Sequence, residues 1–385
     1  MKTSKIRIIL IFTLIIIITL SLIPSVLAKP RKTYITDFLY ECEIKDKGFA
    51  NSVESDNHIV SKEATAYALE ILKEFNLLQK KDLFGTVEHE VNTTHLPEEL
   101  ESNAESEVNS GDPDIYKLYF LLRSLYLLED TNKDYEVGSS VRDNIKTFVD
   151  SLLQKDGGYS ASKSSTTATM ASTYFALKIY DLLDKSYANK SITKSWIRSC
   201  QNSDGGYGGN IGLSSTILNT YYAIFSMDEI EDVDELLNKA FTINYLQSFL
   251  EDDENDVDNY GGYYPDKDAE NTMISSTYYC IMGISLIDDR ELEHEEDTLT
   301  WILNRQNFKD GGFKDIDDKS EQKYSSVVNS YYALELINLI DPDAEATLNQ
   351  EVFMVEFNWW ILVGILIGIG VIAVAIIIIR RKRRI

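Results

Sequence analysis

The stretch Gln201-Asn202-Ser203-Asp204-Gly205-Gly206-Tyr207 is followed by Thr220-Tyr221-Tyr222-Ala223-Ile224, and this combination decides the fold. Adjacent glycines permit positive φ and a close backbone approach, which predicts a tight turn with the aromatic residue packed behind it. The second motif joins a small polar residue, two aromatic residues and two apolar residues, which is typical of a buried helix. A turn and the helix that follows it would form one unit of a larger array.

Both motifs recur along the chain. The double-glycine turn occurs at Gly157 and Gly158, Gly205 and Gly206, Gly261 and Gly262, and Gly311 and Gly312, with a degenerate version at Asp46-Lys47-Gly48-Phe49. The aromatic pair occurs as Tyr119-Phe120, Tyr174-Phe175, Tyr221-Tyr222, Tyr278-Tyr279 and Tyr331-Tyr332, with a weaker version at residues 65–69. The aromatic pairs are 47 to 57 residues apart, so six units fill the chain between its two apolar ends.

Each unit is predicted to be a helical hairpin. Amphipathic stretches before the turns predict outer helices at 141–154, 192–201, 236–250 and 299–306. More apolar stretches after the turns predict inner helices at 166–183, 214–227, 273–287 and 325–340. Six hairpins could stack as an open solenoid, but closure into a ring is favoured because it covers both terminal faces. The predicted fold is all-α, a toroid of six helical hairpins over residues 29–340.

The two ends of the chain predict the compartment. Lys2, Lys5 and Arg7 precede an apolar run that ends near Ala28, which indicates a secretory signal at residues 1–28; an uncleaved signal anchor is the alternative. After a linker at 341–358, residues 359–379 are uncharged and long enough for a transmembrane helix. The basic tail at 380–385 places the C-terminus in the cytoplasm and the toroid outside the cell membrane, as a single-pass surface protein.

The charge of the chain excludes a nucleic-acid partner. The 62 acidic residues all lie between the two ends, and leaving out the eight basic residues of those ends gives 29 bases and a net charge of −33 there. Binding to phosphates requires a basic surface. The acidic surface favours solubility and could attract cations.

The two motifs resemble the repeats of protein prenyltransferase β subunits and of squalene and other terpenoid cyclases. This resemblance implies a six-hairpin α/α toroid. Zinc in the prenyltransferases is held by an aspartate and a cysteine at the start of an inner helix and by a later histidine. The matching positions here hold Ser326 and Val328, or Met273 and Ser275 one repeat earlier, so we expect neither a zinc site nor another cofactor.

Other chemistry has weaker support. Asp315-Ile316-Asp317-Asp318 has the letters of the cyclase acid tetrad, so Asp315, Asp317 and Asp318 are catalytic candidates, although this stretch is separated from the inner helix and a solvated loop explains it as well. Acidic runs at 130–136 and 252–258 leave structural calcium open, but they lack the glycine and distal glutamate of an EF-hand. Cys42, Cys200 and Cys280 form no zinc-type pair.

The paired aromatic residues Tyr119 to Tyr332 could line a central pocket or pack the centre shut. We expect a non-catalytic module that binds an apolar ligand, a glycan or a peptide. The alternatives are a diverged isoprenoid cyclase or prenyltransferase with acidic catalytic residues, and a purely structural or adhesive protein. Gly364 and Gly368 lie four residues apart in the predicted span and would permit a dimer.

Overall fold

The computed structural model describes residues 26–54, 58–81, 84–187, 189–230, 233–316 and 324–355. The chain divides into two compact units. One comprises Lys32–Thr347, and the other combines Met1–Arg31 with Leu348–Ile385.

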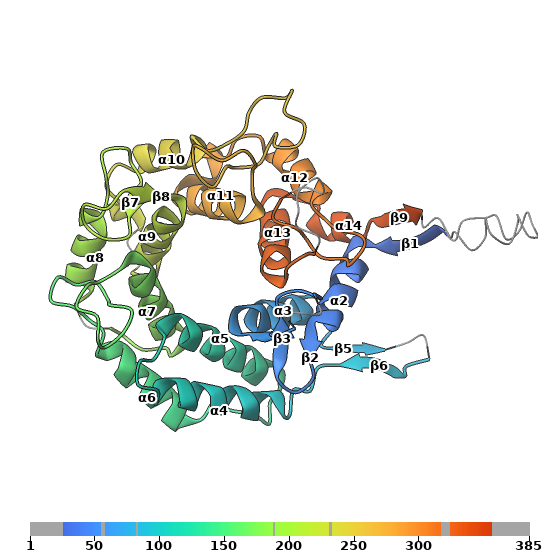
Figure 1. The fold of residues 1–385 in the computed structure, drawn as a ribbon, viewed down its shortest axis with the longest axis horizontal. Helices are drawn as coiled ribbons and strands as arrows, with labels where there is room; N and C mark the ends of the chain where they lie inside the picture. The colour runs from blue at the N-terminus through green and yellow to red at the C-terminus, as the bar shows by residue number, and fades with distance from the viewer. Residues whose placement is uncertain are drawn as a thin grey trace, which may run out of the picture. The chain divides into compact units, whose positions relative to one another are not determined.

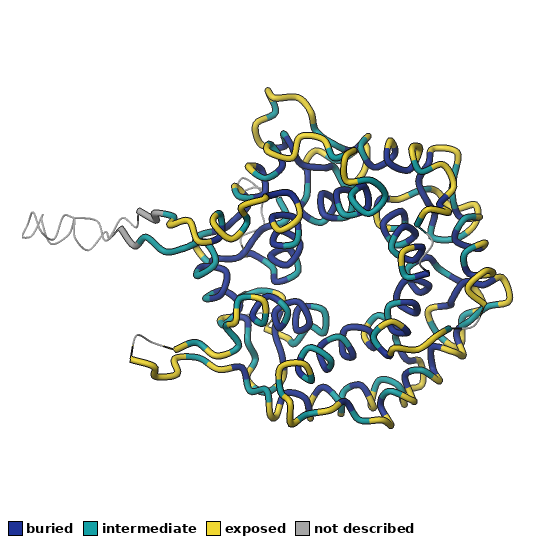
Figure 2. The backbone as a smooth tube through the Cα atoms, turned by 180° about the vertical axis from the view of Figure 1, so that it is seen from behind, coloured by how far each residue is buried: buried dark blue, intermediate teal, exposed yellow. Residues whose placement is uncertain are grey.

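The larger unit is a ring of inner helices surrounded by outer helices (Figure 1). The inner helices are α3 (Lys62–Glu74), α5 (Ile115–Thr131), α7 (Met170–Leu182), α9 (Ile217–Glu229), α11 (Ile274–Asp288) and α13 (Val327–Ile340). The outer helices are α2 (Arg31–Cys42), α4 (Leu96–Val108), α6 (Ser139–Asp150), α8 (Lys190–Ser199), α10 (Lys239–Gln247) and α12 (Glu295–Asn304). The inner helices carry more buried residues than the outer helices, whereas many exposed residues lie in the loops (Figure 2). Every predicted inner and outer segment overlaps a helix, so the α/α toroid is confirmed.

The glycine turns bring each repeat against the next. Gly205 has φ +92°, and a Cβ there would lie 2.2 Å from the carbonyl oxygen of Phe241 on the next outer helix, α10. Any side chain at this position would therefore push the turn away from its neighbour. Behind the turn, the backbone N–H of buried Tyr207 donates to Oγ1 of Thr220 at 3.0 Å. This bond explains why a small hydroxyl residue opens the helical motif, and it recurs from Phe49 to Thr65, Tyr159 to Thr173, Tyr263 to Thr277 and Phe313 to Ser330.

The last repeat makes the same contacts with the first. Gly311 has φ +98°, and a Cβ there would lie 2.1 Å from the carbonyl oxygen of Tyr34 on α2. The N–H of Val327 donates to the carbonyl of Asn51 at 2.9 Å, and the rings of Tyr67 and Tyr331 stack at 4.0 Å. These contacts join the two ends of the array, so the predicted closed ring is confirmed and the open solenoid is wrong.

Short strands and a few helical turns make up the other elements of the described residues. The strands are β1 (Val26–Pro30), β2 (Glu43–Ile44), β3 (Gly48–Ala50), β4 (Val60–Ser61), β5 (Gln79–Lys81), β6 (Val87–Glu90), β7 (Tyr207–Gly208), β8 (Ser215–Thr216) and β9 (Glu351–Val355). The remaining elements are α14 (Ala344–Asn349) and two 3₁₀ turns, η2 (Val233–Glu235) and η3 (Asp289–Glu291). Antiparallel pairs form between β1 and β9, β2 and β3, β3 and β4, β5 and β6, and β7 and β8.

The predicted signal boundary and the predicted linker both overlap helices or strands of the structure. The signal boundary at Ala28 falls inside β1, where Ala28 is paired with Phe353, and the predicted linker at 341–358 contains α14 and β9. In the part of the chain that the structure describes, no helix has both the length and the apolar character needed to cross a bilayer. The predicted span at 359–379, with Gly364 and Gly368, lies outside the described residues.

Candidate functional site

A central cavity of about 300 Å³ lies within the ring and takes its walls from all six inner helices. Aromatic side chains make up most of these walls. The lining residues are Glu63, Tyr67, Tyr116, Tyr119, Phe120, Tyr174, Phe175, Tyr221, Tyr222, Ser275, Tyr278, Tyr279, Val328, Asn329 and Tyr332. Tyr331, the remaining member of the predicted aromatic set, is not among them; its hydroxyl instead accepts a hydrogen bond from Arg123 at 3.0 Å.

The aromatic residues both line the cavity and pack against one another. Tyr278 and Tyr332 stack with centroids 4.2 Å apart, and Tyr174 and Tyr222 stack at 4.7 Å. The hydroxyls of Tyr279 and Tyr332 lie 2.9 Å apart. Each such ring pair contributes about 0.5–1.5 kcal/mol beyond simple burial. This aromatic layer therefore holds the inner helices together while it leaves an open space beside it.

Several lining residues were missed by the sequence analysis, although the helical period contains a signal for them. Glu63, Tyr116, Ser275 and Val328 each precede an aromatic lining residue by four positions. Residues four apart lie on the same face of a helix. Reading the motif one turn upstream would have placed these side chains at the cavity.

Glu63 is the one charged side chain among the described residues that line the cavity. It lies in the first turn of α3, and its carboxylate accepts a hydrogen bond from the Tyr116 hydroxyl at 2.5 Å. Burial raises the pKa of Glu63, and the Tyr116 bond and the positive charge of Arg123 partly offset that rise. The cavity thus combines a carboxyl group with a wall of aromatic rings.

A group of charged residues lies one turn beyond the aromatic layer, on the side away from Glu63. Arg123 forms an ion pair with Glu70, and its guanidinium lies over the rings of Tyr67 and Tyr331 at 5.0 and 5.4 Å. Burial, with Glu70 and Glu74 nearby, raises the pKa of Glu335 to about 7. We call Arg123, Glu70, Tyr331 and Glu335 the Arg123 cluster.

The acid-tetrad candidate Asp315 caps a helix. Its carboxylate accepts from the N–H of Ser275 at 3.0 Å, and its carbonyl accepts from the N–H of Ile274 at 3.1 Å, at the start of α11. Asn51 binds the start of α13 in the same way. Burial raises the pKa of Asp315, and the bonds from Ser275 and Ile274 oppose that rise. Asp317 and Asp318 lie outside the described residues.

The positions of the prenyltransferase zinc ligands have other roles here. Ser326 caps α13 through its side chain, and Val328 lines the cavity. Across the described residues, no group of three or more His, Cys, Asp or Glu side chains could hold a metal ion. Cys42, Cys200 and Cys280 are buried free thiols.

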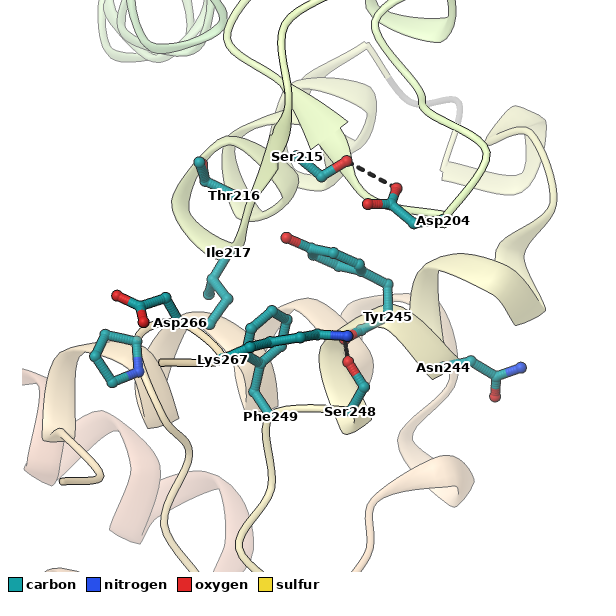
Figure 3. Close-up of a pocket in the computed structure, with 11 residues that line it drawn as sticks. Asp204, Ser215, Thr216, Ile217, Asn244, Tyr245, Ser248, Phe249, Asp266 and Lys267 are labelled. Carbon is teal, nitrogen blue, oxygen red and sulfur yellow. Dashed lines mark hydrogen bonds between the residues drawn. The ribbon is translucent and has the colours of Figure 1, made fainter. Parts of the chain in front are cut away.

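A second hollow, the outer groove, has a volume of about 530 Å³ and lies beside α10 (Figure 3). Tyr245 and Phe249 line it together with Lys267, while Ser215 donates to Asp204 at 2.8 Å on its rim. Thr216, Asp266 and Lys267 are exposed, so solvent reaches much of this surface. The central cavity is smaller but has the convergent aromatic walls of a ligand site, and it is the better candidate.

Two of three comparisons with known proteins identify the same fold. A family model described as the prenyltransferase alpha-alpha toroid domain matches residues 1–164, 104–194, 162–266 and 258–356. The chain is similar in structure to Candida albicans protein geranylgeranyltransferase-I complexed with GGPP, with 17% identity, 84% of this chain and 89% of that chain covered, and a TM-score of 0.53. It is also similar to the apo type II terpene cyclase MstE from Scytonema, with 12% identity, 82% and 97% coverage, and a TM-score of 0.50. No curated protein matches the sequence significantly.

Proposed function

The chain belongs to the prenyltransferase alpha-alpha toroid domain family, and on that basis we propose that its toroid is a binding module for a small ligand in the central cavity. The observation that carries this proposal is the aromatic wall around a space of about 300 Å³. Ligand pockets are mostly apolar, have a few placed polar groups and occupy roughly 300–1,000 Å³. The volume lies at the low end of that range, which favours a compact ligand over a polyprenyl chain. An open cavity also argues against a purely structural filling of the centre.

The binding proposal predicts a saturable site that a bulky residue closes. Three compounds of one shape test it in calorimetry on the full-length chain in nonionic detergent: choline, neutral 3,3-dimethylbutan-1-ol and anionic 3,3-dimethylbutanoate. At least one should bind with one-to-one stoichiometry, and Val328→Trp should abolish that binding because Val328 lines the cavity. Val257→Trp, the same substitution at an exposed site away from the cavity, is the matched control and should bind normally. Failure of all three compounds to bind would overturn the proposal.

A second candidate function rests on Glu63. A carboxyl group whose pKa is raised by burial can serve as a general acid, and aromatic walls suit a cyclase of isoprenoids. Formation of a cyclised product from squalene, abolished by Glu63→Gln, would favour this enzyme over the binding module. No conversion is expected, because the cavity is small for such a chain.

We also propose that the toroid is displayed outside a membrane by residues 359–379, with Trp359 and Trp360 at one edge and the basic tail at the other. The full-length chain should stay with membranes after alkaline carbonate extraction, whereas a chain that ends at residue 355 should be released. In sealed cells, external protease should remove the toroid and leave a tag after Ile385 intact. Loss of the tag instead would reverse the proposed orientation.

A further inference from the structure

The lining of the central cavity should favour positive charge, because it combines aromatic faces with one carboxylate and its described residues include no basic side chain. Among the described residues that line it, eleven are aromatic, Glu63 is acidic and none is Lys or Arg. Glu63 makes its hydrogen bond to a neutral group, the Tyr116 hydroxyl. The faces of aromatic rings attract cations, and the attraction is strongest where water is excluded.

The opposite side of the same aromatic layer shows what these rings accept. There Arg123 lies within 6.0 Å of the ring centroids of Tyr67, Tyr119 and Tyr331, and Glu70 pairs with its guanidinium. The chain therefore supplies its own organic cation on one side, between aromatic faces and a carboxylate. The cavity side also has aromatic faces and a carboxylate. None of the described residues that line it, however, is a cation.

The helix dipoles are the main argument that the cavity would bind an anion rather than a cation. The inner helices begin at the level of Glu63, and helix N-termini favour anions. Each helix has at least one end amide already bound, however: side chains of Ser61, Asp114, Thr169, Thr216 and Ser326 cap five of the helices, and Asp315 caps α11. Two of these six caps are carboxylates, so part of the dipole field is offset. The excess of acidic over basic residues in the chain also favours a cation over an anion.

We propose that the central cavity binds an organic ammonium cation, with the aromatic walls around the ammonium group and the Glu63 carboxylate as its counter-ion. This inference rests on the proposed binding function and specifies its ligand class. A quaternary ammonium group is the clearest case, since it needs no hydrogen-bond acceptor and gains from contact with several ring faces. The volume of about 300 Å³ suits a compact cation such as choline.

The three matched compounds separate this inference from the binding function itself. Choline should bind the full-length chain at least tenfold more tightly than 3,3-dimethylbutan-1-ol, which has the same shape and no charge. The anion 3,3-dimethylbutanoate should bind most weakly. Equal or tighter binding of the neutral or anionic compound would overturn the ammonium assignment while it upheld the binding module, and no binding of any compound would overturn both.

Variants test the two partners of the cation. Glu63→Gln, which keeps the shape of the side chain, should lower choline affinity about tenfold and leave affinity for the neutral alcohol within about twofold. Tyr222→Leu should likewise weaken choline more than the alcohol, because it removes a ring face from the wall. Glu296→Gln changes the net charge equally at an exposed site on α12 and should leave both affinities unchanged. If Glu296→Gln weakened choline as much as Glu63→Gln, the attraction would belong to the whole surface and the proposed site would be wrong.

Discussion

Replacement of Gly311 by alanine should lower the free energy of unfolding by about 2–6 kcal/mol, because strain and overpacking each contribute about 1–3 kcal/mol. The residue has φ +98°, and the new Cβ would lie 2.1 Å from the carbonyl oxygen of Tyr34. The Gly311 turn and the Tyr34 carbonyl, which belong to different repeats, cannot both keep their positions once this Cβ is present. The change acts where the last repeat meets the first, so it tests the closure of the ring directly. Thermal unfolding of the full-length chain, followed by tryptophan fluorescence, measures the loss.

Gly212→Ala is the matched control for the Gly311 prediction. Gly212 also has a positive φ, +80°, but a Cβ there would meet nothing within 4 Å. Its substitution should cost only the backbone strain, about 1–2 kcal/mol. A loss for Gly311→Ala no greater than that for Gly212→Ala would mean that the last turn does not rest on α2.

Replacement of Arg123 by glutamine should cost about 2–4 kcal/mol at pH 8, because breaking a largely buried ion pair leaves a carboxylate without its partner. The Arg123 side chain is 18% exposed, and its partner Glu70 is 31% exposed. The cost should be smaller at pH 5.5. Glu335, with a pKa of about 7, is then protonated in the folded chain, so one fewer negative charge remains beside the missing guanidinium. Urea unfolding of the full-length chain at the two pH values measures both costs.

The sign of this pH effect follows from Glu335. Its pKa in the folded chain is raised above the value of about 4.3 for an unfolded glutamate. Its stabilising contribution is therefore complete below pH 4.3 and is lost as the pH rises through 7. Arg290→Gln is the control, since Arg290 is 84% exposed and its loss should change the free energy of unfolding little at either pH. Equal losses for Arg123→Gln at both pH values would show that lost packing, rather than charge, dominates.

The repeat pattern was enough to predict the toroid because both motifs have direct structural roles. The glycines permit contact between repeats, and the small hydroxyl residue binds the turn behind it. The first two repeats were harder to recognise for a physical reason. The first keeps only Gly48 in its turn, where φ is +125°, and the turn aromatic Phe49 still binds Thr65. Before α5 in the second repeat, Asp114 caps the helix without a double-glycine turn.

The candidate site was less predictable, because several of its features depend on contacts between distant residues. The motif located most of the aromatic wall, yet Tyr331 turns toward Arg123, which lies 208 residues earlier in the chain. Asp315 resembles a catalytic acid in the sequence, but it caps α11 of the preceding repeat. Neither role can be read from a local pattern, whereas Glu63 and Tyr116 could have been found from their spacing of four residues before the aromatic positions.

Because the N–H of Val327 binds the carbonyl of Asn51, the array has no terminal repeat. In a linear array, end units fray first, since each end unit touches a single neighbour. In this ring every hairpin has two neighbours, and the melting of any hairpin breaks both junctions at once. Amide hydrogen exchange should therefore be slow and nearly uniform across all six inner helices, without a gradient from one end of the array to the other.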